Sequence, residues 1–350
     1  MIRNESKKKI EYLVKYMIEQ EVAPAISLAV ITKNDSFMVC GGYKQIIDEQ
    51  IENTNDTIFD LASISKVLVT TTLILKLMED GLLSLKSKVK DILPEFIYPN
   101  ITIKHLITHT SGLPSDLVGY KDMSKEEMIR NIYEVPFEYE TGTQVLYSDL
   151  GFILLGFLIT KLKGDFQQYA SEVLFTPLKM KDTGYNLNIS LLERIASTEN
   201  SKERGLIRGS VHDGKAYKLG GVSGNAGCFS TLADISNFVK MLLNNGIFDG
   251  KQILHPLSIE LMTTLQTEGL NEKRGLGWIL GDKNYPLGDY ASEQTIFHTG
   301  FTGPSILVDF EKEIGVITLA NRIHPSRENK KILDYRNQIH NITLLVETMN

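Results

Sequence analysis

Expected β-strands lie at the two ends of this chain and helices lie between them, and this order limits the fold more than any other feature. Near the N-terminal end, residues 24–30 and 36–39 are rich in β-branched and other apolar side chains, and a turn sequence at residues 33–35 separates them. Near the C-terminal end, strands are expected at residues 278–281, 295–298, 305–310 and 315–320. Because strands must pair to satisfy their backbone groups, we expect the two ends to build one sheet together.

Two amphipathic helices are expected to cover this sheet. One follows the first few residues of the chain, and the last spans residues 329–349. Their apolar stripes consist of Ile10, Leu13, Val14 and Met17 in the first helix and of Ile332, Tyr335, Ile339, Ile342, Val346 and Met349 in the last. Further helices are expected at residues 63–78, 103–108, 125–133, 150–162, 166–173 and 232–245.

This order of elements predicts an α/β protein of the α+β type with two parts. Residues 1–60 and 225–350 are expected to form the α/β sheet domain, and residues 61–224 an inserted, mostly helical domain. With 350 residues, the chain is long enough for one large domain or two interleaved domains. We expect an active site in the cleft between the two parts.

The composition excludes some classes of protein. The formal net charge is −6 and no long basic run occurs, which argues against a nucleic-acid-binding protein. The longest apolar run, residues 152–159, is too short for a membrane span. No signal peptide is visible, so we expect a soluble, cytoplasmic protein, with an export signal removed from a precursor as the alternative. Cys40 and Cys228 lack metal-ligand spacing and are expected to be buried free thiols.

The candidate nucleophile lies in the stretch Ser63-Ile64-Ser65-Lys66, where a polar segment gives way to a long helical run. Ser63 and Lys66 are three residues apart and therefore share one helix face. The helix start favours a developing anion, because its backbone N–H groups are unpaired and the helix dipole is positive there. A lysine one turn further on can take or hold the proton of the serine. This is the arrangement of a serine acyl-transfer nucleophile with a lysine base.

The downstream sequence distinguishes this stretch from two other Ser-x-x-Lys matches, at residues 6–9 and 87–90, which lie in lysine-rich segments. Tyr147-Ser148-Asp149 precedes an expected helix. A phenol beside a lysine ammonium can relay a proton between the nucleophile and the leaving group. Tyr147 is therefore a candidate catalytic residue.

A third piece, His298-Thr299-Gly300, lies at the end of an expected strand. Glycine at that place lets a substrate lie against the strand edge. A backbone N–H nearby can complete an oxyanion hole.

In this order, the three pieces resemble the motifs of the superfamily of serine penicillin-binding proteins and class C β-lactamases. The family pattern is Ser-x-x-Lys, then Tyr-x-Asn or a relative, then Lys/His-Thr-Gly, and the His-Thr-Gly form resembles an esterase-like branch. Other similar stretches are residues 103–113, 226–231, 275–278 and 301–321. The resemblance covers roughly residues 20–325.

The resemblance implies an antiparallel sheet with flanking helices and a helical domain. Ser63 would attack a carbonyl carbon and form an acyl-enzyme, which water would then hydrolyse. Lys66 and Tyr147 would share the base and acid roles, and the N–H groups of Ser63 and Phe301 would form the oxyanion hole. The substrate-binding residues would be Asp149, His298, Thr299, Gly300 and Phe301.

Two positions depart from the family pattern. Asp149 stands where asparagine is usual; asparagine can donate to a substrate carbonyl, whereas an ionised aspartate only accepts. Asp149 either holds Lys66 protonated, which shifts base duty towards Tyr147, or only orients Lys66 and the helix start. His298 stands where β-lactamases have lysine, and histidine is mostly neutral at pH 7. Both changes favour neutral esters or amine-bearing substrates over penicillins, which carry a carboxylate.

Other candidate groups have simpler interpretations. His105 and His109 have the spacing of a zinc pair but no evident third ligand, so we expect them to cap a helix C-terminus. The glycine-rich segment 221–227 lacks the lysine of a phosphate loop and predicts a tight turn near the cleft. The step His212-Asp213 either lines the cleft or holds its loop in place.

The leading hypothesis is a serine hydrolase that acts through an acyl-enzyme on esters, amides or peptides, without a metal or cofactor. Esterase or peptidase activity is favoured over β-lactamase activity. A D-alanyl carboxypeptidase acting on cell-wall peptides is a further alternative, which needs another anion-binding residue such as Arg208 or Lys215. The expected partner is a small-molecule or peptide substrate, and the oligomeric state stays open. The rival hypothesis is a non-catalytic binding or scaffold protein that keeps the fold. The departures from the family pattern at Asp149 and His298 favour this hypothesis.

Overall fold

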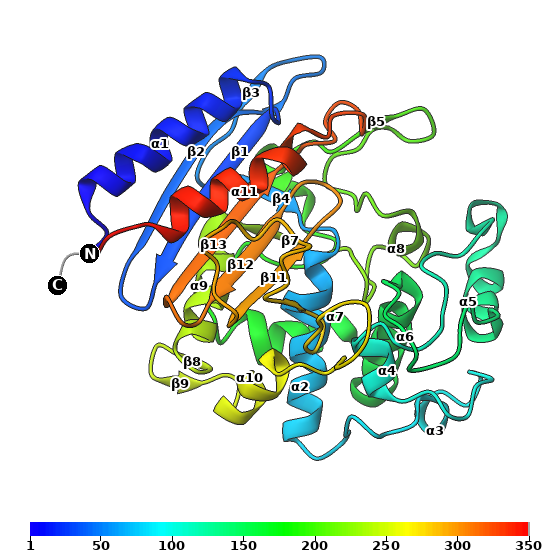
Figure 1. Ribbon diagram of the computed structural model, residues 1–350. Helices are drawn as coiled ribbons and strands as arrows, with labels where there is room; N and C mark the ends of the chain where they lie inside the picture. Colours follow the sequence, from blue (N-terminus) through cyan, green and yellow to red (C-terminus); the bar gives the residue numbers. More distant parts are fainter. Residues whose placement is uncertain (349–350) are drawn as a thin grey trace.

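The computed structural model describes residues 1–348, and its largest element is a seven-stranded antiparallel sheet (Figure 1). The strand order is β10-β11-β12-β13-β1-β2-β3. The strands are β1 (Ala25–Thr32), β2 (Ser36–Gln45), β3 (Ile51–Glu52), β10 (Ile279–Leu280), β11 (Thr295–Thr299), β12 (Ser305–Asp309) and β13 (Ile314–Ala320). The two ends of the chain meet where β1 pairs with β13, from Ile26 opposite Ala320 to Thr32 opposite Ile314. The expected sheet built from both ends is therefore confirmed.

Helices cover both faces of the sheet. Side chains alternate along β1, so that Leu28 and Val30 face one apolar layer while Ala29 and Ile31 face the other. The first layer lies under α1 (Asn4–Glu19) and α11 (Lys331–Leu344), which run along the same face in Figure 1. The second layer includes α9 (Leu232–Leu243) and α2 (Thr71–Glu79) and continues into the core of the helical part. The mixed α and β fold class is as predicted.

The helical part of the molecule lies beside the sheet (Figure 1). Its centre is α6 (Asp149–Lys163), which is apolar on all sides over most of its length, as expected for a helix inside a core. The other helices are η1 (Lys66–Thr70), α3 (Val89–Ile92), α4 (Ile103–Ile107), η2 (Tyr120–Asp122), α5 (Lys125–Glu134), α7 (Phe166–Ala170), η3 (Ser171–Phe175), η4 (Ile189–Arg194), α8 (Gly214–Lys218) and α10 (Pro256–Thr263). The domain boundaries expected near residues 60 and 225 stay a prediction.

Short strand pairs lie outside the large sheet. Strand β4 (Ile58–Asp60) pairs with β7 (Phe229–Thr231), which lies far along the chain. The backbone N–H of Leu61 extends this pairing by donating to the carbonyl of Cys228 at 3.0 Å. Two hairpins complete the strands, formed by β5 (Asn200–Ser201) with β6 (Gly205–Leu206) and by β8 (Ile247–Phe248) with β9 (Lys251–Gln252). The β4–β7 pair carries the chain directly to the candidate nucleophile.

Two expected helices have different bounds in the structure. The expected helix at 63–78 begins with the π-helix η1 and continues as α2. The last helix ends at Leu344, because the chain beyond it turns back and Thr348 forms an isolated bridge with Ile2. The expected stripe residue Met349 lies outside the described residues. Within residues 1–348, no helix has the length and apolar character needed to cross a membrane.

Candidate active site

Ser63 lies on a sharp turn between β4 and the helical run of η1. The preceding residue, Ala62, has a φ of 45°, a left-handed conformation that costs energy in a residue with a Cβ. Asp60 holds this turn, because its Oδ1 accepts from the Ala62 N–H at 2.8 Å and its Oδ2 accepts from the His212 N–H at 2.7 Å. The strained turn places Ser63 at the start of the helical run, on the wall of a cavity.

Lys66 is fully buried and touches the candidate nucleophile. Its Nζ lies 2.9 Å from Ser63 Oγ, 2.9 Å from the Asn225 carbonyl oxygen and 2.7 Å from Asp149 Oδ1. Burial alone would lower the pKa of Lys66, but the Asp149 carboxylate and the Tyr147 phenol outweigh it and hold the pKa above its ordinary value. Lys66 is therefore an ammonium in this site rather than a neutral base.

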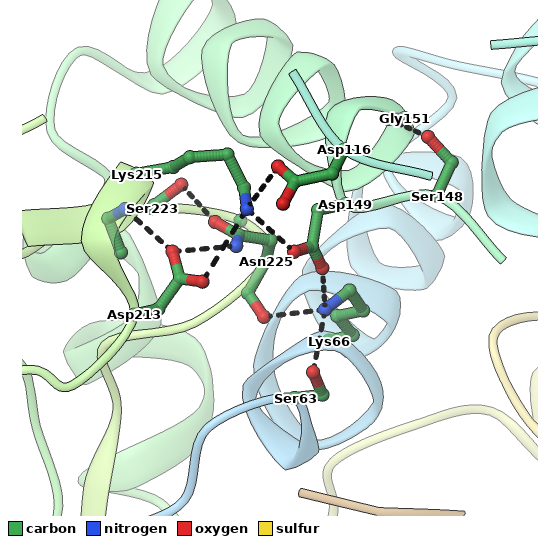
Figure 2. A network of polar contacts seen from close by, with 12 residues as sticks. Ser63, Lys66, Asp116, Ser148, Asp149, Gly151, Asp213, Lys215, Ser223 and Asn225 are labelled. Atoms are coloured by element: carbon green, nitrogen blue, oxygen red, sulfur yellow. Dashed lines mark hydrogen bonds and ion pairs between the residues drawn. The ribbon is translucent and has the colours of Figure 1, made fainter. Parts of the chain in front are cut away.

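Asp149 joins two lysines, as Figure 2 shows. While its Oδ1 contacts Lys66, its Oδ2 lies 3.1 Å from Lys215 Nζ. Lys215 Nζ also lies 2.7 Å from Asp116 Oδ1 and 3.8 Å from Asp213 Oδ2. Burial would raise the pKa of Asp149, but the two lysines outweigh it and hold the pKa below its ordinary value. These contacts favour the interpretation in which Asp149 keeps Lys66 protonated.

The start of α6 fixes Asp149 in place. Ser148 is the N-cap, whose Oγ accepts from the Gly151 N–H at 3.3 Å and donates to the Pro114 carbonyl at 2.6 Å. The backbone N–H of Ser148 donates to His109 Nδ1 at 3.1 Å. Asp149 is then the first residue of the helix, where the positive end of the dipole stabilises a carboxylate.

Tyr147 lies among three groups that fix its ring. The ring centroid is 4.7 Å from that of His109, 6.1 Å from that of His298 and 5.0 Å from Lys66 Nζ. Burial, with the positive charges of Arg274 and Lys66, lowers the pKa of His109 well below its ordinary value. His109 is therefore a neutral packing partner of the tyrosine.

His298 and Thr299 reach the same cavity from the end of β11. His298 Nδ1 lies 2.9 Å from the Thr299 carbonyl oxygen, so this nitrogen carries the proton and donates. Burial, reinforced by the charges of Arg274 and Lys66, lowers the pKa of His298 well below its ordinary value. A neutral imidazole does not hold a substrate carboxylate by charge, and the structure offers no support for that role.

Gly300 packs closely against the nucleophile turn. A Cβ on Gly300 would lie 2.4 Å from the Leu61 carbonyl oxygen and 2.6 Å from Pro304 Cγ. Thr302 Oγ1 donates to the carbonyl of Asp60 at 2.7 Å beside this contact. Glycine therefore lets the end of β11 approach the turn. Gly300 is not one of the residues that line the cavity, and its expected contact with a substrate stays a prediction.

Phe301 lies at the edge of the cavity, where its side chain is 47% exposed and stacks on the His212 ring at a centroid distance of 5.6 Å. Within residues 1–348, neither the Ser63 N–H nor the Phe301 N–H donates a hydrogen bond. Two unpaired N–H groups on residues of one cavity wall meet the chemical requirement of an oxyanion hole.

The cavity that these residues share has a volume of about 600 Å³. It is lined by Ser63, Tyr147, Asp149, His298, Thr299 and Phe301 among the expected site residues. The loops at 113–122 and 187–216 supply much of the opposite wall, including His212 and Asp213. Of the two anion-binding candidates, Lys215 lines the cavity, whereas Arg208 lies outside it and donates to the carbonyl of Ile195 at 2.9 Å.

The sequence pattern missed one buried cation of the cavity wall. Arg274 is 2% exposed, and its guanidinium carbon lies 5.9 Å from the Tyr147 ring centroid. Its charge is matched by an ion pair with Glu272. The only signal was its position directly before residues 275–278, one of the stretches that resemble the family.

Two further expectations need correction. His105 Nδ1 accepts from the Thr102 N–H at 3.2 Å in a capping box, so His105 caps the N-terminus of α4 rather than the C-terminus. Cys40 is only partly buried, whereas Cys228 is buried as expected. The glycine-rich segment turns near the cavity as expected, with a φ of 89° at Gly221 and 112° at Gly227, and it packs on α6 where Gly224 meets Gly156. In the described part of the chain, no group of three or more His, Cys, Asp or Glu side chains could hold a metal ion.

Comparisons with known proteins give a consistent result. The family model described as Beta-lactamase matches residues 10–340. The chain is 30% identical to the "Putative D-alanyl-D-alanine carboxypeptidase" of Escherichia coli K12, covering 86% of this chain and 79% of that protein. It is 28% identical to the N-acetylmuramyl-L-alanine amidase of Bacillus subtilis, covering 89% of this chain and 80% of that protein. Among solved structures, EstCE1, a hydrolase with promiscuous acyltransferase activity, has a similar fold, with a TM-score of 0.76, 20% identity and coverage of 96% and 99% of the two chains.

Proposed function

Since the chain belongs to the beta-lactamase family of serine hydrolases, we propose that it hydrolyses esters and amides through an acyl-enzyme on Ser63. The observation that carries this proposal is the contact of 2.9 Å between Lys66 Nζ and Ser63 Oγ, with Asp149 holding the same ammonium at 2.7 Å. A serine that contacts a buried cation next to a phenol is placed for proton transfer.

In the first half of the reaction, Ser63 Oγ attacks the carbonyl carbon of the substrate while Tyr147, as the phenolate, takes the hydroxyl proton. The positive charge of the Lys66 ammonium stabilises the phenolate. Asp149 keeps Lys66 protonated and so maintains this charge. The N–H groups of Ser63 and Phe301 stabilise the tetrahedral oxyanion. Tyr147 then gives its proton to the leaving alcohol or amine, and the acyl-enzyme remains.

In the second half, a water molecule attacks the ester carbonyl of the acyl-enzyme. Tyr147, again a phenolate after its proton has left with the first product, takes a proton from this water. The tetrahedral intermediate collapses, the carboxylic acid leaves, and Ser63 Oγ regains its proton from Tyr147. In both halves Tyr147 therefore acts first as the base and then as the acid.

The charges around Ser63 support an uncharged or amine-bearing substrate. Near the nucleophile, the ammonium groups of Lys66 and Lys215 face three carboxylates, those of Asp116, Asp149 and Asp213. Arg274, a buried cation of the cavity wall, is paired with Glu272, and His298 is neutral. Arg204 also lines the cavity, and its guanidinium donates to the Val211 carbonyl and to Ser210 Oγ. Next to Ser63, a substrate carboxylate would find only paired cations, which disfavours carboxypeptidase and penicillin-hydrolysing activity. The relative named as an amidase supports cell-wall peptide amides as one natural class.

The test is the hydrolysis of p-nitrophenyl butyrate by the wild type and by Ser63→Ala. We expect Ser63→Ala to lose at least about 1,000-fold in kcat, since it removes the nucleophile. A fluorophosphonate should add to the wild type and to Ser201→Ala, whose serine lines the same cavity, but not to Ser63→Ala, as measured by intact mass. Equal rates for wild type and Ser63→Ala would overturn the assignment. A wild type that neither reacts with the fluorophosphonate nor turns over any ester would favour the scaffold alternative.

A further inference from the structure

Lys215 is a buried lysine that the proposed reaction does not use. Its side chain is 4% exposed, yet it lies on the wall of the cavity. It belongs to α8, the short helix whose N-cap is Asp213, and reaches across to the start of α6 (Figure 2). Burial alone would lower its pKa, but Asp213 and Asp149 outweigh burial and raise it, so the side chain stays an ammonium. Keeping an ammonium group buried costs free energy of folding, so we expect Lys215 to have a function.

The donors of Lys215 are not all used by its partners. An ammonium group has three N–H donors. Two acceptors lie at hydrogen-bond distance, Asp116 Oδ1 at 2.7 Å and Asp149 Oδ2 at 3.1 Å. The third carboxylate oxygen, Asp213 Oδ2, is 3.8 Å away, beyond the range of a good hydrogen bond. One N–H of Lys215 therefore has only a weak partner on the cavity wall.

Asp149 and Lys215 together present an acceptor and a donor. Asp149 accepts from Lys66 with one oxygen and from Lys215 with the other, so an ionised Asp149 has no donor of its own to offer a substrate. Lys215 places an N–H at the neighbouring position. A primary amide at position 149 could supply both functions, because it carries one accepting oxygen and two N–H donors.

We propose that Lys215 is a substrate-binding residue, whose ammonium donates a hydrogen bond to a neutral carbonyl oxygen next to the reacting acyl group. The substrate class is then N-acyl amino acid esters and amides, in which an amide carbonyl lies close to the scissile bond. A carboxylate is disfavoured at this place, because the surrounding carboxylates of Asp116, Asp149 and Asp213 outnumber the two lysines. The proposal rests on the proposed acyl transfer at Ser63 and deepens it.

The test compares two thioesters of equal chain length, one of N-acetylglycine and one of pentanoic acid, which lacks the amide. The measured quantity is the preference ratio, kcat/KM for the first divided by kcat/KM for the second. In the wild type we expect a ratio well above one. In Lys215→Met it should fall about 10- to 100-fold, the effect of losing one charged hydrogen bond to the substrate. Lys121→Met is the matched control. Lys121 also lines the cavity and also has a carboxylate partner, Glu203 at 2.7 Å, and its variant should keep the wild-type ratio.

A second variant separates substrate binding from a structural role. Lys215→Met leaves one oxygen of Asp149 without its cation, so the variant is expected to lose stability and some activity on both substrates. In the double variant Asp149→Asn/Lys215→Met, the amide relieves this unpaired charge and supplies the missing donor. Its preference ratio should return to within about threefold of the wild type.

The outcomes separate the two proposals. Turnover of neither thioester by the folded wild type would overturn acyl transfer at Ser63, and the role of Lys215 with it. Turnover of both thioesters by the wild type, with an unchanged ratio in Lys215→Met, would overturn only the donor role. A double variant that recovers thermal stability but not the ratio would show that Lys215 only balances the charge of Asp149.

Discussion

At the scale of single residues, the site depends on which groups carry charge. Lys66 and Asp149 stay charged because each lies against the other. His298 and His109 stay neutral because burial and the positive charges of Arg274 and Lys66 all lower their pKa. Around Ser63, the buried charges are therefore those that an opposite charge touches.

The neutrality of His298 leads to a prediction about pH. We expect the ratio of kcat/KM for a carboxylate-bearing ester to that for its neutral analogue to stay constant between about pH 5.5 and 8. A protonated His298 would favour the anionic ester at low pH, and the ratio would fall as pH rose through its pKa. Since that pKa lies well below its ordinary value, no such step belongs in this range. The measurement is a pair of pH–rate profiles on the two esters.

His298→Lys provides the comparison for these profiles. The ordinary pKa of lysine is about 10.4, so a fall of up to about two units from burial still leaves an ammonium at every pH of the series, which should raise the ratio about tenfold. If the wild-type ratio falls through a single step near pH 6.5 while the His298→Lys ratio stays flat, the neutral assignment of His298 is wrong.

Part of the site could be predicted from the sequence. The short motifs named Ser63, Lys66, Tyr147 and Thr299, which all lie in or against one cavity. The pattern could not show the ion pairs of Lys215, because its three carboxylate partners come from three separate segments of the chain. The packing of Gly300 could not be predicted for the same reason: the backbone that it approaches, at Leu61, is distant in sequence.

At the scale of elements, the site depends on how closely α6 approaches the glycine-rich segment. A Cβ on Gly156 would lie 2.7 Å from the backbone nitrogen of Gly224 and 3.0 Å from its Cα. Thr70 Oγ1 donates to the carbonyl of Gly224 at 2.7 Å from the other side. The next residue, Asn225, provides the carbonyl that accepts from Lys66. The contact between helix and segment therefore sets the position of the lysine.

Gly156→Ala tests this contact. The added methyl group meets backbone atoms, so we expect a loss of about 1–3 kcal/mol in the free energy of unfolding and a lower kcat. Gly151→Ala on the same helix is the control, because its Cβ would lie 3.4 Å from its nearest neighbour, the Leu106 carbonyl oxygen, and helix propensity favours alanine. Urea denaturation and ester hydrolysis measure the two effects. Equal stability of both variants would contradict the packing argument.

Long elements were easier to predict than short ones. Helices α5, α6 and α9 were expected to within about two residues, because each has apolar residues at helical spacing over several turns. Strands β4 and β7 were missed, since each has three residues and owes its form to a partner that is far away in the chain. Helix α11 was expected to be longer than it is, because the apolar spacing continues beyond its end. Val346 fits this spacing and is buried, but it lies in a non-helical segment.

At the scale of the whole molecule, buried histidines limit the stability at acidic pH. Burial lowers the pKa of His340 from 6.5 to about 4, and the charge of Arg336 adds to this effect. The unfolded chain therefore binds more protons than the folded one between these values, and stability is lost as pH falls below about 6.5. His109 and His298 act in the same direction.

His340 allows this limit to be tested away from the site. Its Nδ1 donates to the Pro286 carbonyl at 2.6 Å, a bond that an asparagine amide can replace. Lowering the pH from 7 to about 5 should reduce the free energy of unfolding of both proteins. We expect this reduction to be about 1–2 kcal/mol smaller for His340→Asn than for the wild type. Urea denaturation curves at several pH values measure the difference. Parallel pH dependence in the two proteins would show that His340 titrates normally in the folded state.

The pairing of β1 with β13 has a consequence for synthesis of the protein. Ser63 leaves the ribosome early, but β11, which completes the cavity wall, follows more than two hundred residues later. At ordinary translation rates of about 5–20 residues per second, the nascent chain carries this serine for roughly ten to fifty seconds before β11 is made. The strand that β1 needs as its neighbour arrives later still. The nucleophile therefore gains its reactive surroundings only after β11 and β13 have been translated, and a chain that stops before β11 would carry Ser63 as an ordinary serine.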